Sequence, residues 1–242
     1  MVLVSPRNPL NIGAAARAMA NFGLSRLAVV APYAPTWREA RSAIGAPDLL
    51  QDAKEFTTLA EAVADCTLVA GTGSLTYRKP KQPVVVLPAL APMVARELRL
   101  DGRVAVVFGS EKHGLTGDDL SICHVLVEIL TDNSQPSMNL GQAVAVCLYE
   151  LATRVEMAVA GAPEAAEPRE LRVTSGGLDR LAGLAEEVML AAGYSPRTMQ
   201  AANRRDLALM LRRLAMNEQD TRRIMGLFRR ILWRLNHTAK PL

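Results

Sequence analysis

The chain has 242 residues, of which 50% are hydrophobic and 21% charged, so it can bury a substantial core and is not disordered as a whole. Its net charge of +4 is compatible with a polyanionic partner but does not require one. Aromatic residues make up only 4% of the chain, which excludes an extensive platform for stacking single-stranded RNA bases.

The first part of the chain alternates short apolar runs with helical patterns. A helical stretch that Gly23 can cap separates apolar runs at residues 2–4 and 27–30, which is the pattern of a strand-helix-strand unit. The alternation continues with expected helices at 58–66 and 89–100 and expected strands at 67–70, 84–87 and 104–108.

Beyond residue 108, Thr116 is the expected N-cap of a short helix that ends near Cys123. A strand at 125–129 and a long apolar helix at 139–154 follow. Continuous apolar strands that alternate with helices predict an α/β fold, with a mostly parallel sheet covered by helices on both faces.

The composition changes after this helix. Residues 160–168 are small, acidic and proline-bearing, which is typical of an exposed linker. Helical spacing of apolar and charged positions then returns at 178–192, 204–217 and 220–235, with Asn217 as an expected cap. We therefore predict an α/β domain at residues 1–157, a linker at 158–172 and a small all-α module at 173–242.

The three cysteines, Cys66, Cys123 and Cys147, are widely spaced and lie in apolar contexts. This pattern favours reduced core residues over a disulfide framework or a zinc site, and we expect no metal. No apolar run reaches the roughly 18 residues of a membrane span, and the N-terminus has no basic segment followed by a cleavage site. We therefore expect a cytoplasmic protein.

Three short segments each lie next to the end of a predicted strand, where open parallel sheets bind ligands. The first, Asn11-Ile12-Gly13-Ala14-Ala15-Ala16-Arg17, offers an amide, a glycine and an arginine. The second, Phe108-Gly109-Ser110-Glu111 with Gly114-Leu115, offers main-chain amides and a carboxylate. The third, Pro136-Ser137-Met138-Asn139-Leu140, offers a hydroxyl and an amide at a helix start. Each segment alone also fits an ordinary helix start or strand-end turn.

A fourth glycine-bearing strand end, Gly71-Thr72-Gly73-Ser74, lacks the spacing of dinucleotide-binding loops and the lysine of a phosphate-binding loop. Dinucleotide binding and nucleotide hydrolysis therefore find no support. His113 is a candidate acid or base by residue type, but a surface histidine is the simpler interpretation.

In order and spacing, the three segments resemble the motifs of the SPOUT superfamily of RNA methyltransferases, in its TrmH-type branch, over residues 2–154. The resemblance implies a trefoil knot in the C-terminal part of the sheet, a homodimer with sites at its interface, and S-adenosylmethionine as cofactor. It also implies which residues line the cofactor site: Thr72, Gly73, Gly109, Ser110, Gly114, Ile129, Ser137 and Leu140.

The same resemblance implies attack of a ribose 2′-hydroxyl on the sulfonium methyl without a metal. Arg17 matches the catalytic position of the first motif. Because an arginine with a pKa above about 12 is a poor base, we expect Arg17 to hold the adjacent phosphate and stabilise developing alkoxide charge. Asn11, Glu111, Ser137 and Asn139 are expected to position Arg17 and the ribose.

The helical module carries arginine pairs, several of them at seven-residue steps that place residues on shared helix faces. We expect a basic stripe for the RNA backbone, made of Arg205, Arg212, Arg222, Arg223, Arg229 and Arg230. The alternative is an ordinary solvated surface in an arginine-rich chain.

A knotted domain followed by a linker and such a module is similar to the TrmJ proteins. This similarity implies tRNA as the substrate and nucleotide 32 of the anticodon loop as the target. Two alternatives stay open from the sequence: ribosomal RNA as the substrate, and an RNA-binding protein that has kept the fold without the activity.

Overall fold

The computed structural model describes residues 1–74, 80–160, 172–194 and 199–238. Within these residues, seven strands form one sheet in the order β3-β2-β1-β6-β4-β7-β5, and every neighbouring pair is parallel. The strands are β1 Val2–Val4, β2 Ala28–Val30, β3 Lys54–Phe56, β4 Leu68–Thr72, β5 Val84–Val86, β6 Val104–Phe108 and β7 Val125–Glu128. The predicted parallel sheet is confirmed.

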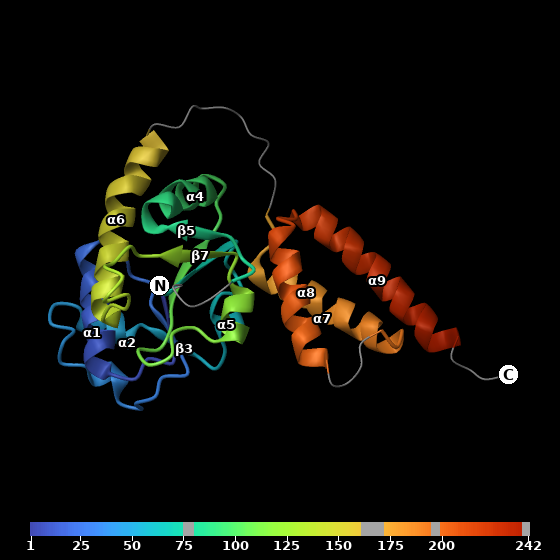
Figure 1. The fold of residues 1–242 in the computed structure, drawn as a ribbon, viewed down its shortest axis with the longest axis horizontal. Helices are drawn as coiled ribbons and strands as arrows, with labels where there is room; N and C mark the ends of the chain where they lie inside the picture. The colour runs from blue at the N-terminus through green and yellow to red at the C-terminus, as the bar shows by residue number, and fades with distance from the viewer. Residues whose placement is uncertain (75–79, 161–171, 195–198, 239–242) are drawn as a thin grey trace.

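Helices cover both faces of this sheet (Figure 1). Successive strand residues point to opposite faces, and because both sets are apolar here, each face needs a cover. On β6, Val106 and Phe108 pack into one core, whereas Ala105 and Val107 pack into the other. One face holds α1 (Pro9–Asn21), α4 (Leu87–Arg99) and α6 (Leu140–Ala160), and the other holds α3 (Leu59–Ala62) and α5 (Gly117–Ile122). This two-sided burial explains the continuous apolar strands.

The local signals that end or begin helices behave as the sequence predicts. Gly23 has φ +71° just beyond the end of α1, a conformation that suits glycine at a helix C-terminus. Thr116 caps α5 with its side chain, and Asp119 completes a capping box. The side-chain oxygen of Asn217 accepts a hydrogen bond from the amide of Asp220 at 2.7 Å at the start of α9.

Several elements differ from the sequence-based expectation. The helix expected at 58–66 is a single short turn, α3. The segment between β2 and β3 contains the 3₁₀ helix η1 (Trp37–Glu39) and the short helix α2 (Pro47–Gln51), and neither these nor β3 were predicted. The fully buried indole of Trp37 holds this segment against the α1 face of the sheet.

Helix α6 continues to Ala160, past the expected domain end at residue 157. The expected linker at 158–172 therefore begins inside a helix, and its residues 161–171 lie outside the described part of the chain. The domain boundaries and the trefoil knot stay predictions.

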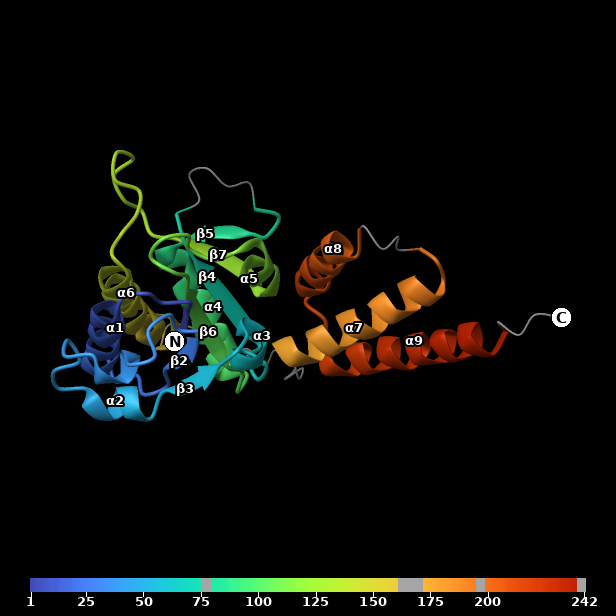
Figure 2. The same ribbon diagram turned by 90° about the horizontal axis from the view of Figure 1, so that it is seen from below.

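The described part of the tail folds into a separate layer of three helices, α7 (Ser175–Ala191), α8 (Gln200–Arg213) and α9 (Glu218–Thr238), as predicted. They share a small core in which Leu181 and Leu211 pack against Phe228. Figure 1 and Figure 2 show this module beside the α5 side of the sheet, with α9 farthest along the chain.

Contacts with the α/β domain of the same chain hold this module in place. The amide of Ser175 donates to the carbonyl of Cys66 at 2.7 Å, at the start of α7. Arg172 forms an ion pair of 2.8 Å with the buried carboxylate of Glu97. On α8, Arg205 pairs with Asp118 of α5. The module is therefore docked in cis.

Arg212 is the buried anchor of the docked module, and its predicted place in the RNA-binding stripe is wrong. Its side chain is 1% exposed and donates hydrogen bonds to the carbonyl of Ile122 at 2.7 Å and to the hydroxyl of Ser175 at 3.1 Å. It also pairs with Asp179 at 2.7 Å. All three guanidinium nitrogens of Arg212 thus donate to protein groups, and the side chain has almost no contact with solvent.

Arg212→Ala tests this anchor, because it leaves Asp179 and the carbonyl of Ile122 without their donor. We expect the free energy of unfolding to fall by about 3 kcal/mol, as for the loss of one partner from a buried ion pair. The matched control is Arg213→Ala, at the exposed neighbouring position, which is expected to change it by less than about 0.5 kcal/mol. Thermal unfolding of the full chain measures both, and equal effects would contradict an anchoring role.

Candidate active site

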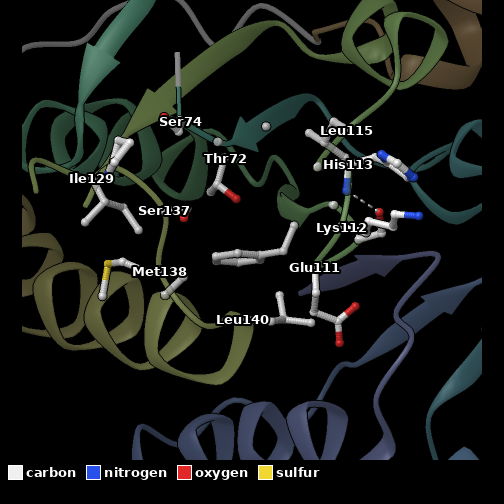
Figure 3. A pocket seen from close by; sticks show the side chains of 18 of the residues that line it. Thr72, Ser74, Glu111, Lys112, His113, Leu115, Ile129, Ser137, Met138 and Leu140 are labelled. Atoms are coloured by element: carbon white, nitrogen blue, oxygen red, sulfur yellow. Dashed lines mark hydrogen bonds between the residues drawn. The ribbon is translucent and has the colours of Figure 1, made fainter. Parts of the chain in front are cut away.

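A cavity of about 270 Å³ lies at the carboxyl ends of β4, β6 and β7. This is the edge at which open α/β sheets bind ligands. Figure 3 shows Thr72 and Ser74 on one side of the cavity, Ile129, Ser137, Met138 and Leu140 on a second side, and Lys112 and His113 on a third. All the residues predicted to contact a cofactor line this cavity: Thr72, Gly73, Gly109, Ser110, Gly114, Ile129, Ser137 and Leu140.

The loop after β6 folds back on itself to form one wall. The amide of Gly114 donates to the carbonyl of Ser110 at 2.8 Å, and the amide of His113 donates to the Ser110 hydroxyl at 3.2 Å (Figure 3). Gly114 has φ +65°, which glycine adopts without strain. A Cβ on Gly109 would overlap the main chain of Gly114 and Leu115. Gly109 is therefore required by the packing of the loop itself.

The opposite wall combines a fixed hydroxyl with open main chain. The Thr72 hydroxyl is buried and donates to the carbonyl of Val107 at 3.0 Å, which fixes its orientation while its oxygen can still accept a hydrogen bond. No atom lies within 4 Å of a Cβ placed on Gly73, so a ligand can approach the backbone there. Leu126 and Ile129 add apolar surface. Few polar groups on an apolar lining are typical of small-molecule sites.

Glu111 links the first and second motifs beside this cavity. Its carboxylate accepts hydrogen bonds from the amides of Arg7 at 2.8 Å and Asn8 at 3.1 Å, and from the side chain of Asn11 at 2.9 Å. In Figure 3 it points toward the blue helix α1. Burial raises the pKa of Glu111, but the donated hydrogen bonds outweigh it and hold the pKa below the ordinary value of 4.5. The group is ionised at neutral pH.

Asn11 extends this network to the third motif. Its side-chain oxygen accepts a hydrogen bond from Asn139 at 2.9 Å. The oxygen of Asn139 in turn accepts from the amide of Gly141 at 2.9 Å, at the start of α6. Gly141 also lets α6 approach α1, because an added Cβ would lie 2.8 Å from the Cβ of Ala14. The three motifs thus form one hydrogen-bonded unit, as their shared place at the sheet edge predicts.

Arg17 is not part of this unit. Its side chain is exposed on α1 and does not line the cavity. It also forms no hydrogen bond or ion pair with any of the described residues. A step of six residues turns about 240° around a helix, so Arg17 and Asn11 face different directions. Within the described chain, Asn11, Glu111 and Asn139 therefore make no hydrogen bond to Arg17, and the expectation that they and Ser137 position Arg17 and the ribose stays a prediction.

Lys112 and His113 both line the cavity, although the residue pattern does not indicate Lys112 and favours a surface position for His113. The two glycines, Gly109 and Gly114, could have predicted this position. They allow a tight loop, and the residues at the tip of such a loop lie at the cavity rim. Gly13, by contrast, belongs to the first motif but does not line the cavity. An added Cβ there would lie 2.8 Å from the amide of Ala43, so Gly13 serves the packing of α1.

The remaining arginines of the predicted stripe are exposed on the helical module. Arg222, Arg223, Arg229 and Arg230 all lie at exposed positions of α9. The guanidinium of Arg230 lies 4.5 Å from the centre of the Trp233 ring. Arg205 is exposed as well, although Asp118 pairs with it. Contact of these residues with RNA stays a prediction.

Among the described residues, no three His, Cys, Asp or Glu side chains gather in a way that could hold a metal ion. In the same part of the chain, no helix combines the length and apolar character needed to cross a membrane.

Comparisons with known proteins agree with this geometry. Residues 1–149 match the model of the SpoU rRNA Methylase family. The tRNA (cytidine/uridine/adenosine-2′-O-)-methyltransferase TrmJ of Pseudomonas aeruginosa is 34% identical over 250 residues, which cover 100% of this chain and 95% of that protein. The tRNA (cytidine-2′-O-)-methyltransferase TrmJ of Methanocaldococcus jannaschii is 35% identical, over 64% of this chain and 67% of its own.

A solved structure extends the similarity to the whole fold. The crystal structure of TrmJ from Z. mobilis ZM4 superposes with a TM-score of 0.81 at 30% identity, and covers 95% of this chain and 97% of that one. This match includes the helical module, and it confirms the resemblance predicted from the three motifs. The chain belongs to the SpoU rRNA methylase family.

Proposed function

We propose that this protein transfers a methyl group from S-adenosylmethionine to a ribose 2′-hydroxyl of tRNA. The observation that carries the proposal is the hydrogen-bonded unit of Asn11, Glu111 and Asn139 beside a cavity lined by the residues predicted for the cofactor. Full-length similarity to proteins named as tRNA 2′-O-methyltransferases supports the same reaction and substrate.

The cavity residues fit S-adenosylmethionine by their chemistry. Leu115, Leu126 and Ile129 offer an apolar wall to the purine, while the open backbone at Gly73 offers main-chain groups to polar edges. When bound, this cofactor supplies a methyl group on a positively charged sulfur. In the reaction a bond forms between the ribose oxygen and the methyl carbon, the carbon–sulfur bond breaks, and the hydroxyl proton leaves to solvent or a base.

The chain's own part in this reaction is positioning and charge stabilisation. Asn11 and Asn139 are fixed at the helix starts, where their amides can orient a ribose beside the cavity. Ser137 lines the cavity next to them. Arg17 holds a phosphate and stabilises the negative charge that develops on the ribose oxygen, a role for a fixed cation and not for a base.

We further propose a homodimer in which the site is completed by Arg17 of a second copy. Leu10 and Arg17 are seven residues apart, so they share the outer face of α1. Next to them, α6 exposes the apolar side chains of Val146 and Tyr149, and the Tyr149 ring meets the ring of Phe22 edge to face at the end of α1. Two helices with exposed apolar residues around an unpaired arginine suit an isologous contact between identical chains.

The proposal extends to the substrate and the compartment. The exposed arginines of α9, held on the α/β domain by docking in cis, provide a surface for the phosphate backbone of tRNA. Nucleotide 32 of the anticodon loop is the proposed target, and the cytoplasm, where such RNA is modified, is the proposed compartment.

Two measurements test the function. Mapping 2′-O-methylation in total RNA from a strain that lacks the gene is expected to show loss at nucleotide 32 of tRNA. Loss confined to ribosomal RNA would instead support the alternative substrate. Calorimetry with S-adenosylmethionine is expected to show binding to the purified protein, and no binding at millimolar cofactor would leave only a non-catalytic RNA-binding role.

Glu111→Gln tests the carboxylate that joins the motifs. The NH2 group of glutamine would face N–H groups that now donate to the Glu111 carboxylate, so at least one of these hydrogen bonds is lost. We therefore expect kcat to fall about tenfold or more while cofactor affinity stays within about twofold. The matched control is Glu39→Gln, an exposed acid of the same domain with the same charge change. An unchanged kcat would contradict the positioning role.

The pH dependence of stability gives the same prediction a second readout. Because the folded pKa of Glu111 lies below the ordinary value of 4.5, the ionised carboxylate stabilises the native state fully above that pH. The difference in unfolding free energy between wild type and Glu111→Gln is therefore expected to be constant near neutrality. It should shrink as the pH falls through the folded pKa.

A mixed dimer tests whether Arg17 acts across the interface. Arg17→Ala removes the cation, and Gly73→Phe fills the cavity from a position with open space around its Cβ. We expect each variant alone to lose methyl transfer. Their co-purified heterodimer should regain activity, because one site then combines an open cavity with the partner's intact Arg17. Absence of recovery, with heterodimers verified by mass spectrometry, would assign Arg17 to its own chain's site.

A further inference from the structure

Two residues in strained backbone conformations lie directly after β1 and β2. Ser5 has φ +48° and Ala31 has φ +44°, a region that residues other than glycine rarely adopt. The amide of Ser5 donates to the carbonyl of Val30 at 2.8 Å, and the amide of Ala31 donates to that of Phe56 at 2.9 Å. Such outliers persist where surrounding contacts impose them, and they gather at functional sites.

The two turns bring together a loop from each strand at the carboxyl edge of the sheet. The amide of Tyr33 donates to the carbonyl of Pro6 at 3.1 Å. Above this contact, the guanidinium carbon of Arg7 lies 4.5 Å from the centre of the Tyr33 ring. The geometry is that of a cation–π pair.

This pair is exposed, although an aromatic ring gains most when it is buried. Tyr33 is 69% exposed, and Arg7 lies at an exposed position. Although the guanidinium lies over the ring, most of the surface of Tyr33 therefore stays accessible to solvent. An oriented ring with an accessible surface and a cation beside it is suited to stack a nucleobase and to contact its phosphate.

The pair lies next to the active site but outside the cavity. The main-chain amide of Arg7 donates to Glu111 at 2.8 Å, so a single hydrogen bond separates this loop from the catalytic unit. Neither Arg7 nor Tyr33 lines the cavity. A ligand on the ring is therefore a neighbour of the reacting group and not the cofactor.

We propose that Tyr33 stacks on a nucleobase adjacent to the methylated nucleotide of the substrate RNA, while Arg7 binds the phosphate beside it. This inference rests on the proposed function for the identity of the RNA. It makes Arg7 and Tyr33 positioning residues for the substrate strand, fixed by the strained turns at Ser5 and Ala31. The ring and the cation are placed before RNA arrives, so little conformational freedom is lost on binding.

The stacking is tested with an anticodon stem-loop RNA that carries 2-aminopurine on either side of nucleotide 32. Stacking on the ring quenches this base, so the fluorescence of the bound RNA is expected to fall with wild-type protein and with Tyr33→Phe, which keeps the ring. Tyr33→Leu is expected to abolish the quenching at one of the two positions. The side chain is mostly exposed, so this variant is expected to fold, and circular dichroism checks that it does.

Kinetics on the same variants separate substrate positioning from a structural role. For Tyr33→Leu we expect KM for the RNA to rise about tenfold, with kcat and cofactor affinity within about twofold. Tyr33→Phe is expected to restore the wild-type KM. An unchanged KM in Tyr33→Leu, or a wild-type protein that quenches neither position, would overturn the proposal.

The phosphate contact has a separate test in the salt dependence of RNA binding. Arg7→Gln is expected to reduce the slope of log affinity against log salt by about 0.7, as for the loss of one contact with a single strand. The matched control is Arg26→Gln, an exposed arginine just before β2 at the opposite edge of the sheet, which should leave the slope unchanged. Equal slopes for the two variants would overturn the role of Arg7.

Failure of the proposed function is visible independently of these results. If the wild-type protein transfers no methyl group to tRNA yet quenches 2-aminopurine in a manner that depends on Tyr33, the enzyme proposal is wrong and the stacking site stands. If methyl transfer occurs and Tyr33→Leu behaves as wild type, the reverse holds.

Discussion

The site depends on one carboxylate. Glu111, at the end of β6, accepts hydrogen bonds from the loop after β1 and from Asn11 of α1, and Asn11 holds Asn139 at the start of α6. These groups meet because β1 and β6 are neighbours in the sheet although about a hundred residues separate them in sequence. The parallel register brings both strand ends to one edge, and the ionised carboxylate then joins them with charge-assisted hydrogen bonds.

How far the sequence predicts this arrangement depends on the range of the forces involved. Caps and turns such as Thr116 and Gly23 are local, so the residue pattern predicts them correctly. The short helix α2 and the strand β3 lack a periodic pattern, and the burial of Trp37, which only the tertiary structure creates, holds their segment in place. The cofactor residues were placed in one cavity by family resemblance, since no local rule joins strand ends that lie so far apart along the chain.

Arg212 illustrates the limit of reading a helix face from spacing alone. Seven-residue steps group Arg205 with Arg212, and both side chains contact α5, yet Arg212 is buried in this contact whereas Arg205 stays exposed. Burial of Arg212 is tolerated because Asp179, Ser175 and a backbone carbonyl satisfy the guanidinium. The consequence is functional: docking in cis fixes the exposed arginines of α9 relative to the cavity of the same chain.

The low aromatic content of the chain gives the few exposed rings more weight. An RNA-binding surface with little stacking capacity must rely on charge, which attracts any polyanion and selects poorly among sequences. Tyr33 is an exception at the sheet edge, held by Arg7 and by two strained turns, and it lies one hydrogen bond from Glu111. A carboxylate that fixes both the Asn11–Asn139 pair and the loop carrying this ring would, under the proposed function, align the reacting nucleotide with its neighbour. Charge would then attract the RNA, and the fixed ring would place one particular ribose at the site.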